Sequence, residues 1–352
     1  MSRIRRVPLA LAVLLFALTP TLLCAADDVT SEQLEAWRGV ASSDLRCAVP
    51  STDVRAAFGG WDRTTPRRGV AADCSDSSTN PSGDYEPSQM QVIPVVVHIL
   101  MDNACNSGQI SDERVFSQIE ILNEDFQAIV GTNGANGYNS LIQFELASVD
   151  PQGDPTTGIT RTCNTTYFQD NGSYWNELAW DPNRYMNIYT NQAGGALGYV
   201  PFLPADGGGS GVGQLRDRVV ILHTTFGRDA PFVPFDQGRT GTHEVGHYLG
   251  LEHTFSGGCG TSECYLTGDL ICDTNSESSP VFGCPGSSNS CSTPDPFDNF
   301  MDYSDDLCME RFTQEQTRRM ICTLRNYRDQ LAQVDDGTIF ADGFESGDIT
   351  AW

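Results

Sequence analysis

The hydrophobic positions first predict a buried strand followed by an amphipathic helix. Val92 to Leu100 is a nearly unbroken apolar run, typical of a strand that is covered on both faces. Ser111 can cap the helix that follows. Its apolar residues recur at intervals of three and four, at Val115, Ile119, Leu122 and Phe126. The order of strand and then helix predicts a sheet with a helix packed behind it.

Later segments add strands to this sheet. Residues 141–149 alternate apolar and polar positions, and residues 185–190 and 219–223 have the length and composition of further strands. The stretch from Gly194 to Pro201 lies between the last two, and its Gly and Pro content predicts an edge strand, centred on Leu197 to Val200, with an accessible backbone. Together these segments predict a twisted mixed sheet.

The C-terminal third of the chain follows a different pattern. Residues 259–299 are rich in Gly, Ser, Pro and Cys, so we expect them to be irregular. A final helix is predicted near Thr313, because Thr313 and Gln316 match a capping box. The apolar residues that this helix is expected to bury are Met320, Leu324, Tyr327 and Leu331.

The two ends of the chain have the character of processing segments. Arginines followed by the apolar run Leu9 to Leu18, and small residues before Asp27, predict a secretory signal peptide over residues 1–26. Residues 27–88 lack sustained periodicity and are interpreted as a propeptide and linker, with linker character strongest from Asp73 to Glu86. The folded domain is expected over residues 89–334, followed by an acidic, Gly-rich tail over residues 335–352.

Charge and cysteine content narrow the function. The net charge is −25, and all 21 basic residues are arginines, which disfavours nucleic acids as partners and excludes lysine-based chemistry. No apolar run is long enough to span a membrane. Twelve cysteines in an exported chain predict disulfides. Removal of Cys24 with the signal peptide leaves eleven, so one mature thiol is expected to be unpaired.

The chemistry is concentrated in one segment. His243 and His247 are four residues apart, so on a helix both imidazoles project from one face and can share a zinc ion. Glu244 can reach a zinc-bound water without binding the metal, which makes it the candidate general base. Gly250 can end the helix in a left-handed conformation, so that the chain turns and His253 becomes the third ligand. Three protein ligands leave the fourth position for water, as in catalytic zinc sites.

Other interpretations of this segment are weaker. A short HExxH motif arises by chance on amphipathic helices, but three of only five histidines here occupy the positions of the extended motif. The other two, His98 and His223, lie in apolar strands and are expected to be core residues. A binding module with structural zinc is disfavoured by the intact Glu244, and a thermolysin-like site would require a glutamate as third ligand.

The extended motif HExxHxxGxxH is the signature of metzincin proteases, which also have a methionine in a turn beneath the zinc, here Met301. More closely, the chain resembles the pappalysin family, which includes pappalysin and ulilysin. The resemblance covers roughly residues 90–330 and rests on these segments: 93–98, 118–126, 158–160, 238–240, 253–255, 273–274, 301–306 and 311–313. Asn275 departs from the family, whose members usually have proline there.

The resemblance implies a fold, an activity and a compartment. The fold is α+β, with a twisted mixed five-stranded sheet, a backing helix, an active-site helix, and an irregular disulfide-rich lower subdomain that holds the Met-turn and a C-terminal helix. The activity is that of a zinc endopeptidase acting on proteins or peptides, with Tyr303 as a candidate to steady the tetrahedral oxyanion. We expect a secreted protein, extracellular or periplasmic, and a monomer.

The resemblance also suggests disulfide pairs. Family members bond the cysteine seven residues after the Met-turn methionine to one upstream, which suggests Cys284 with Cys308. Cys291 would then pair with Cys259 or Cys264, and Cys272 with whichever of these two remains. Cys105 with Cys163, and Cys74 with Cys322, follow by elimination, although sequence alone cannot decide connectivity.

Three finer expectations concern calcium, specificity and latency. Asp269 and Asp273 are candidate calcium ligands, with solvated loop acids as the alternative. The acids Asp305 and Asp306 motivate a preference for a basic residue after the scissile bond.

Cys47 resembles an Arg-Cys element of family precursors and is a candidate latency switch that would occupy the open zinc position, unless it pairs with Cys74 or with another chain. A cut between residue 47 and about residue 90, with Arg67-Arg68-Gly69 as one candidate, would then activate the precursor.

Overall fold

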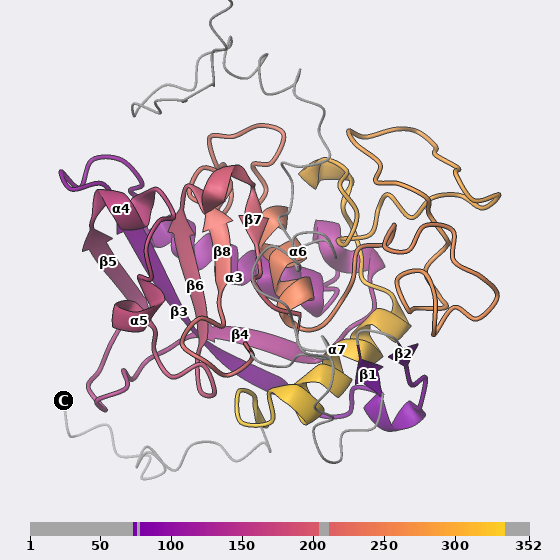
Figure 1. Ribbon diagram of the computed structural model, residues 1–352, viewed down its shortest axis with the longest axis horizontal. Helices are drawn as coiled ribbons and strands as arrows, with labels where there is room; N and C mark the ends of the chain where they lie inside the picture. Colours follow the sequence, from indigo (N-terminus) through magenta and orange to yellow (C-terminus); the bar gives the residue numbers. More distant parts are fainter. Residues whose placement is uncertain (1–72, 76–77, 204–210, 335–352) are drawn as a thin grey trace, which may run out of the picture.

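A mixed sheet lies at the centre of the molecule (Figure 1). Five of its strands lie side by side in one order, and two more pair with one of these five. The computed structural model describes residues 73–75, 78–203 and 211–334. The strands of the sheet are β3 (Gln91–Met101), β4 (Ile142–Leu146), β5 (Ile159–Cys163), β6 (Met186–Asn191), β7 (Gly198–Tyr199), β8 (Val219–Leu222) and β9 (Gln333–Val334). Their order is β4-β3-β6-β8-β7, with β5 and β9 also paired to β3.

The two additional strands, β5 and β9, both pair with β3. β4 pairs with residues 91–95 of β3 and β5 with residues 97–101, so the two follow one another along one edge of β3. β9 pairs only with Gln91 and Val92, beyond the part of β3 that β6 covers. β3, β4, β5, β6 and β8 run parallel to one another, whereas β7 is antiparallel to β8 and β9 is antiparallel to β3. The predicted mixed five-stranded sheet is confirmed, and β5 is a strand that the sequence pattern did not reveal.

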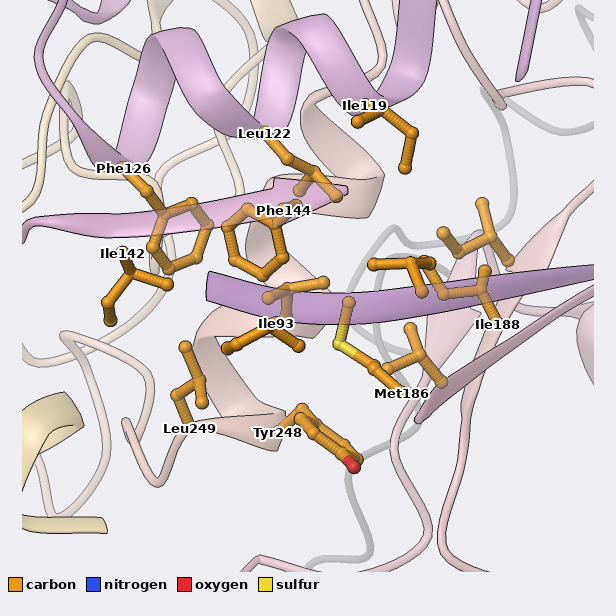
Figure 2. Packing of buried hydrophobic residues seen from close by; sticks show 14 of the residues in the cluster. Ile93, Ile119, Leu122, Phe126, Ile142, Phe144, Met186, Ile188, Tyr248 and Leu249 are labelled. Carbon is orange, nitrogen blue, oxygen red and sulfur yellow. The ribbon is translucent and has the colours of Figure 1, made fainter. Parts of the chain in front are cut away.

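Two helices cover one face of this sheet. Helix α3 (Asp112–Phe126) begins at the predicted cap, where the Ser111 side chain accepts the backbone N–H of Arg114. Helix α6 (Arg239–Tyr248) packs against α3 and β8. Figure 2 shows Leu122 and Phe126 of α3 and Tyr248 of α6 directed into one apolar cluster with Ile93 of β3. This cluster is the main core, and its contacts fix the position of α6 against the sheet.

The opposite face carries a smaller aromatic cluster. The short helices α4 (Thr165–Phe168) and α5 (Trp175–Leu178) lie on this side, with Tyr174 and Tyr189 fully buried between them and the sheet. His98 also points to this face, where it stacks on Tyr189 with 4.5 Å between ring centroids. Its ring nitrogens lie 2.8 Å from Thr160 Oγ1 and 3.0 Å from Asn187 Oδ1, so His98 is a satisfied core residue, as expected.

Disulfides hold the C-terminal part, which has little regular structure before its last helix. The five pairs are Cys74–Cys322, Cys105–Cys163, Cys259–Cys291, Cys264–Cys272 and Cys284–Cys308. They agree with the expected pairs and decide that Cys291 bonds to Cys259 rather than to Cys264. The remaining short helices are 3₁₀ turns at η2 (Gly83–Tyr85), η3 (Asn133–Asn136), η4 (Ala193–Gly195) and η5 (Asp306–Cys308).

Helix α7 (Gln314–Tyr327) begins at the predicted capping box of Thr313 and Gln316. Met320 and Leu324 are buried as expected, whereas Tyr327 is only partly buried. Leu331 is buried too, but it lies beyond the end of the helix.

The stretch expected to be a linker is docked onto α7. β1 (Cys74–Ser75) and β2 (Ser78–Thr79) form a two-stranded sheet, and Cys74 is bonded to Cys322 of α7. Arg319 of α7 donates to Thr79 Oγ1, and Glu86 forms an ion pair with Arg318 at 2.5 Å. Residues 73–86 are therefore attached to the folded domain at several points.

Several predicted segments lie outside the described residues. These are the signal peptide, most of the propeptide with Cys47, and the tail over residues 335–352. Within the described part, no helix is long and apolar enough to cross a bilayer.

Candidate metal centre

Three histidines converge at the end of helix α6. His247 Nε2 lies 3.1 Å from His243 Nε2 and 3.0 Å from His253 Nε2. All three side chains are buried, and burial lowers the pKa of His247 to about 4, so its imidazole is neutral. Neutral imidazoles with converging lone pairs repel one another unless they share a cation. Among the described residues, no other His, Cys, Asp or Glu joins this cluster.

The other ring nitrogen of two of these histidines is held by the backbone. His243 Nδ1 lies 2.7 Å from the carbonyl oxygen of Phe300, and His247 Nδ1 lies 2.7 Å from that of Leu251. A carbonyl accepts only from a protonated nitrogen, so these contacts place the proton on Nδ1. Nε2 is then the lone-pair nitrogen, which is the arrangement found around metal-bound histidines.

The turn after α6 brings in the third histidine. Gly250 has a φ of +93°, and the backbone N–H of Leu251 donates to the Gly246 carbonyl at 3.0 Å. This closes the helix in the left-handed conformation that favours glycine. The chain reverses there, and His253 reaches the same point as His243 and His247. The predicted role of Gly250 is confirmed.

Glu244 lies against the edge strand of the sheet. Its side chain is buried, and a Cβ built on Gly198 of β7 would lie 2.7 Å from Glu244 Cγ and 2.9 Å from Oε1. The two residues are therefore in van der Waals contact only because position 198 carries no side chain. The sequence identified Glu244 but contained no signal that Gly198 is its neighbour.

The predicted methionine lies beneath the histidines. Met301 is fully buried, and its backbone N–H donates to Asn299 Oδ1 at 2.9 Å. Tyr303, two residues later, places its ring centroid 4.9 Å from that of His253 and 5.8 Å from that of His243. Phe255 stacks on His253 with 4.7 Å between ring centroids and also contacts the Tyr303 ring at 4.9 Å. Tyr303 thus packs against two of the three histidines of the metal centre, and its predicted role at the oxyanion stays a prediction.

A buried network fixes the start of α6. Arg239 Nη2 lies 3.1 Å from Asp125 Oδ1, and Thr242 Oγ1 donates to Asp125 Oδ2 at 2.6 Å. Asp306 Oδ2 accepts the backbone N–H groups of Gln237 and Arg239 at 2.9 and 3.1 Å. Sequence reasoning missed this network, because its members come from three distant segments. The local motifs contained Asp125 and Arg239 but did not indicate that they pair.

The two acids predicted to bind calcium are directed to different places. Asp269 lines a cavity of about 80 Å³ together with Thr254 and Thr274, and Asp269 Oδ2 accepts from Thr274 Oγ1 at 2.7 Å. Asp273 instead accepts the backbone N–H of Glu315 at 2.9 Å, at the start of α7. Asp273 does not line the cavity.

A second buried acid near this cavity was not foreseen. Glu277 accepts from Thr254 Oγ1 at 2.7 Å and is fully buried, and no hydrogen-bond partner is found for its Oε1. Burial and then the nearby charge of Asp302 raise the pKa of Glu277 to about 8. Burial likewise raises the pKa of Asp269 to about 7. The protein groups around these two carboxyls therefore supply too little positive charge to keep them ionised at neutral pH.

Comparisons with known proteins agree with this geometry. The family model described as Peptidase_M43, pregnancy-associated plasma protein-A, matches residues 170–325. An extracellular metalloprotease of Colletotrichum graminicola is 34% identical over 67% of this chain and 77% of its own length. Extracellular metalloprotease 1 of Coccidioides posadasii is 34% identical over 63% of this chain and 72% of its own length. A solved structure of mature mirolysin from Tannerella forsythia with a cleaved peptide is 34% identical, with a TM-score of 0.55, and covers 70% of this chain and all of its own.

Proposed function

The chain belongs to the peptidase M43 (pappalysin) family of extracellular zinc metalloproteases, and on this premise we propose that it is an endopeptidase whose general base is Glu244. The observation that carries the proposal is the convergence of three buried Nε2 atoms, with Glu244 lining the same small pocket as His243. Three neutral imidazoles that converge on one point are a donor set that suits catalytic zinc. His243, His247 and His253 would hold the ion.

The chain's own groups then divide the work of peptide hydrolysis. When bound, zinc supplies a Lewis acid that polarises the scissile carbonyl and makes water more acidic. Glu244 takes the proton from the attacking water and later donates it to the leaving amine. The Tyr303 hydroxyl donates a hydrogen bond to the oxyanion of the tetrahedral intermediate. Its ring contacts with His253 and His243 support this role.

The edge strand β7 is the proposed binding strand for substrate. Among the described residues, β7 is the last strand of the sheet on its side, and Gly198 places its backbone against Glu244. An extended peptide can add to such an edge through main-chain hydrogen bonds, which select side chains only weakly. The substrates are accordingly proteins or peptides in extended conformation.

The test compares three variants on a quenched peptide substrate. Glu244→Gln should retain zinc while kcat falls by about 10³-fold or more, because the base is lost and the shape is kept. His253→Ala should lose both zinc and activity. His223→Gln, which alters a partly buried histidine outside the centre, should keep both. An active Glu244→Gln protein would refute the assignment.

Calcium is proposed for the cavity beside the metal centre. The predicted Asp269, which lines the cavity, is retained as a ligand. Glu277 is added because it accepts from Thr254 of the cavity wall and its buried Oε1 has no hydrogen-bond partner. Hard carboxylate and hydroxyl oxygens of Asp269, Glu277 and Thr254 suit calcium. Asp273, the other predicted ligand, would contribute through the loop it anchors to α7 rather than by lining the cavity.

Latency is proposed to depend on Cys47. This cysteine lies in the proposed propeptide and would block the metal in the precursor, after export directed by the signal peptide over residues 1–26. Cys47→Ser in the full-length precursor should then be active before any processing, and an equally silent variant would exclude the cysteine.

The proposal also includes a preference for the substrate residue that follows the scissile bond. A basic residue after the scissile bond is expected from the acids Asp305 and Asp306 behind the Met-turn, of which Asp306 also accepts backbone N–H groups at the start of α6. Profiling on a peptide library tests this preference. The enzyme is proposed to act as a monomer, and the tail over residues 335–352 lies outside the catalytic domain.

A further inference from the structure

The edge strand β7 has few backbone contacts of its own. Two residue pairs join it to β8, Gly198 with Ile221 and Tyr199 with Val220, and one further backbone bond runs from the Leu222 N–H to the Leu197 carbonyl at 2.7 Å. The turn before it contains Gly194 and Gly195, both with positive φ. A two-residue pairing after a glycine turn fixes a strand weakly, because each ladder bond contributes only about 1 kcal/mol. The position of β7 must therefore depend on its side chains.

Alternate side chains of β7 enter different layers. Gly198 and Val200 face the main core and α6, whereas Leu197 and Tyr199 belong to the aromatic cluster on the other face. This follows from the two-residue period of a strand. A force that holds Tyr199 in one layer therefore sets the distance between Gly198 and Glu244 in the other.

Tyr199 is held by a partly buried set of charged and hydroxyl groups. Its hydroxyl donates to Asp170 Oδ1 at 3.0 Å and accepts from Arg218 Nη2 at 3.1 Å. The Tyr174 hydroxyl makes the same two kinds of contact, to Asp170 Oδ1 at 2.7 Å and from Arg218 Nε at 3.2 Å. Two tyrosine hydroxyls thus lie between an acid and a guanidinium. Hydrogen bonds to charged groups are about twice as strong as neutral ones.

Arg218 is itself fixed in place. It directly precedes β8, is 6% exposed, and lies 3.9 Å above the ring of Trp175. Its Nη1 donates to the Arg216 carbonyl at 2.8 Å. A buried guanidinium with all of these contacts has one orientation, so it can locate the Tyr199 hydroxyl rather than follow it. Burial raises the pKa of Tyr199 to about 12, so the hydroxyl stays protonated and can donate to Asp170.

We propose that Tyr199 is a positioning residue for substrate binding: Arg218 and Asp170 hold its hydroxyl from one face of the sheet, which keeps the edge of β7 at Gly198 in register for an extended substrate. This inference rests on the proposed peptidase function. Tyr199 and Arg218 touch neither the metal nor the reacting atoms. Their effect passes through the backbone of β7.

The test separates long from short substrates. Tyr199→Phe keeps the ring and removes the hydroxyl. For a peptide with several residues before the scissile bond, KM should rise about tenfold with kcat changed less than about threefold. For a peptide with one residue there, which does not pair along β7, KM should stay within about twofold. Arg218→Lys, which keeps the charge but loses the planar fork, should show the same pattern.

A binding measurement and a matched control complete the design. In the Glu244→Gln background, the Kd of the long peptide should rise about tenfold when Tyr199→Phe is added. Tyr167→Phe removes a tyrosine-carboxylate bond of 2.8 Å, to Glu177, in the same cluster but away from β7, and should change neither KM nor Kd. Equal losses on long and short peptides, or none on either, would overturn the proposal. If the parent enzyme cleaves neither peptide, the peptidase function itself fails, which is a distinct result.

Discussion

Met301 Sδ lies so close beneath Gly246 that a Cβ built on this glycine would be only 2.5 Å from the sulfur atom. Gly246 is between the two helical histidines, so the methionine supports the floor of the metal centre directly. Both residues are fully surrounded, with Phe312 also near the same point. Contact between the helix and the Met-turn is thus part of how the ligands are held.

The first prediction concerns this contact. Gly246→Ala should lower stability by about 1 to 3 kcal/mol, because an extra methyl group overpacks a closed core. It should also reduce zinc content, since α6 must move away from Met301. Thermal unfolding and metal analysis measure both effects. Adding Met301→Ala should recover part of the zinc binding, and a double variant no better than the single one would argue against direct steric contact.

The second prediction concerns Tyr303. Tyr303→Phe should lower kcat by about 10²-fold with little change in KM, because the lost hydroxyl acts on the oxyanion rather than on bound substrate. Zinc content should be unchanged, since the ring still packs against His253. Steady-state kinetics and metal analysis check this. A variant with normal kcat would reduce Tyr303 to a packing role.

The third prediction concerns calcium. Selective removal of calcium with zinc retained should lower the melting temperature, because the buried carboxyls of Asp269 and Glu277 are left without enough positive charge nearby. Glu277→Gln should be less sensitive to calcium than the parent. Glu263→Gln, an exposed acid in the same Cys-rich region, serves as the control and should respond like the parent. Identical melting curves with and without calcium would remove the site.

The fourth prediction concerns the N-terminus of the mature enzyme. Residues 73–86 are bonded to α7 through Cys74–Cys322 and through the ion pair of Glu86 with Arg318. Processing should therefore leave a chain that begins at or before residue 73, as N-terminal sequencing would show. A cut later in this stretch would leave a peptide that is released only on reduction. Release without reductant would contradict the docking.

The fifth prediction is a pH dependence that arises from His98. Burial lowers the pKa of His98 from 6.5 to about 4. Between pH 6.5 and 4 the unfolded chain therefore binds more protons at His98 than the folded protein does. The contribution of His98 to the free energy of unfolding is then fully present above pH 6.5 and is lost as the pH falls toward 4. The loss amounts to at most about 3 kcal/mol. Denaturant unfolding should show that the advantage of the parent over His98→Gln shrinks across this window. A constant difference would contradict the prediction.

Local spacing by itself determined much of this protein. The interval between His243 and His247 matches one helical turn, and Gly250 is the residue that accepts the left-handed turn toward His253. The strand at residues 91–101 and the capping box at Thr313 were likewise predictable from the sequence, because both depend on neighbours a few positions away. Periodicity, motif and resemblance were thus sufficient to predict the three histidine ligands and the five strands of the main order of the sheet.

Contacts across the sheet were decided by the tertiary structure alone. Gly198 and Glu244 are 46 positions apart in the numbering, and only the pairing of β7 with β8 brings them together. Two further contacts depend on how irregular loops fold over α7 and α6. One is the disulfide of Cys291 with Cys259 rather than with Cys264, and the other is the hydrogen bonding of Asp306 to the start of α6. Such loops carry no period, so their partners follow from three-dimensional packing, in which a residue's nearest neighbours in space are distant in sequence.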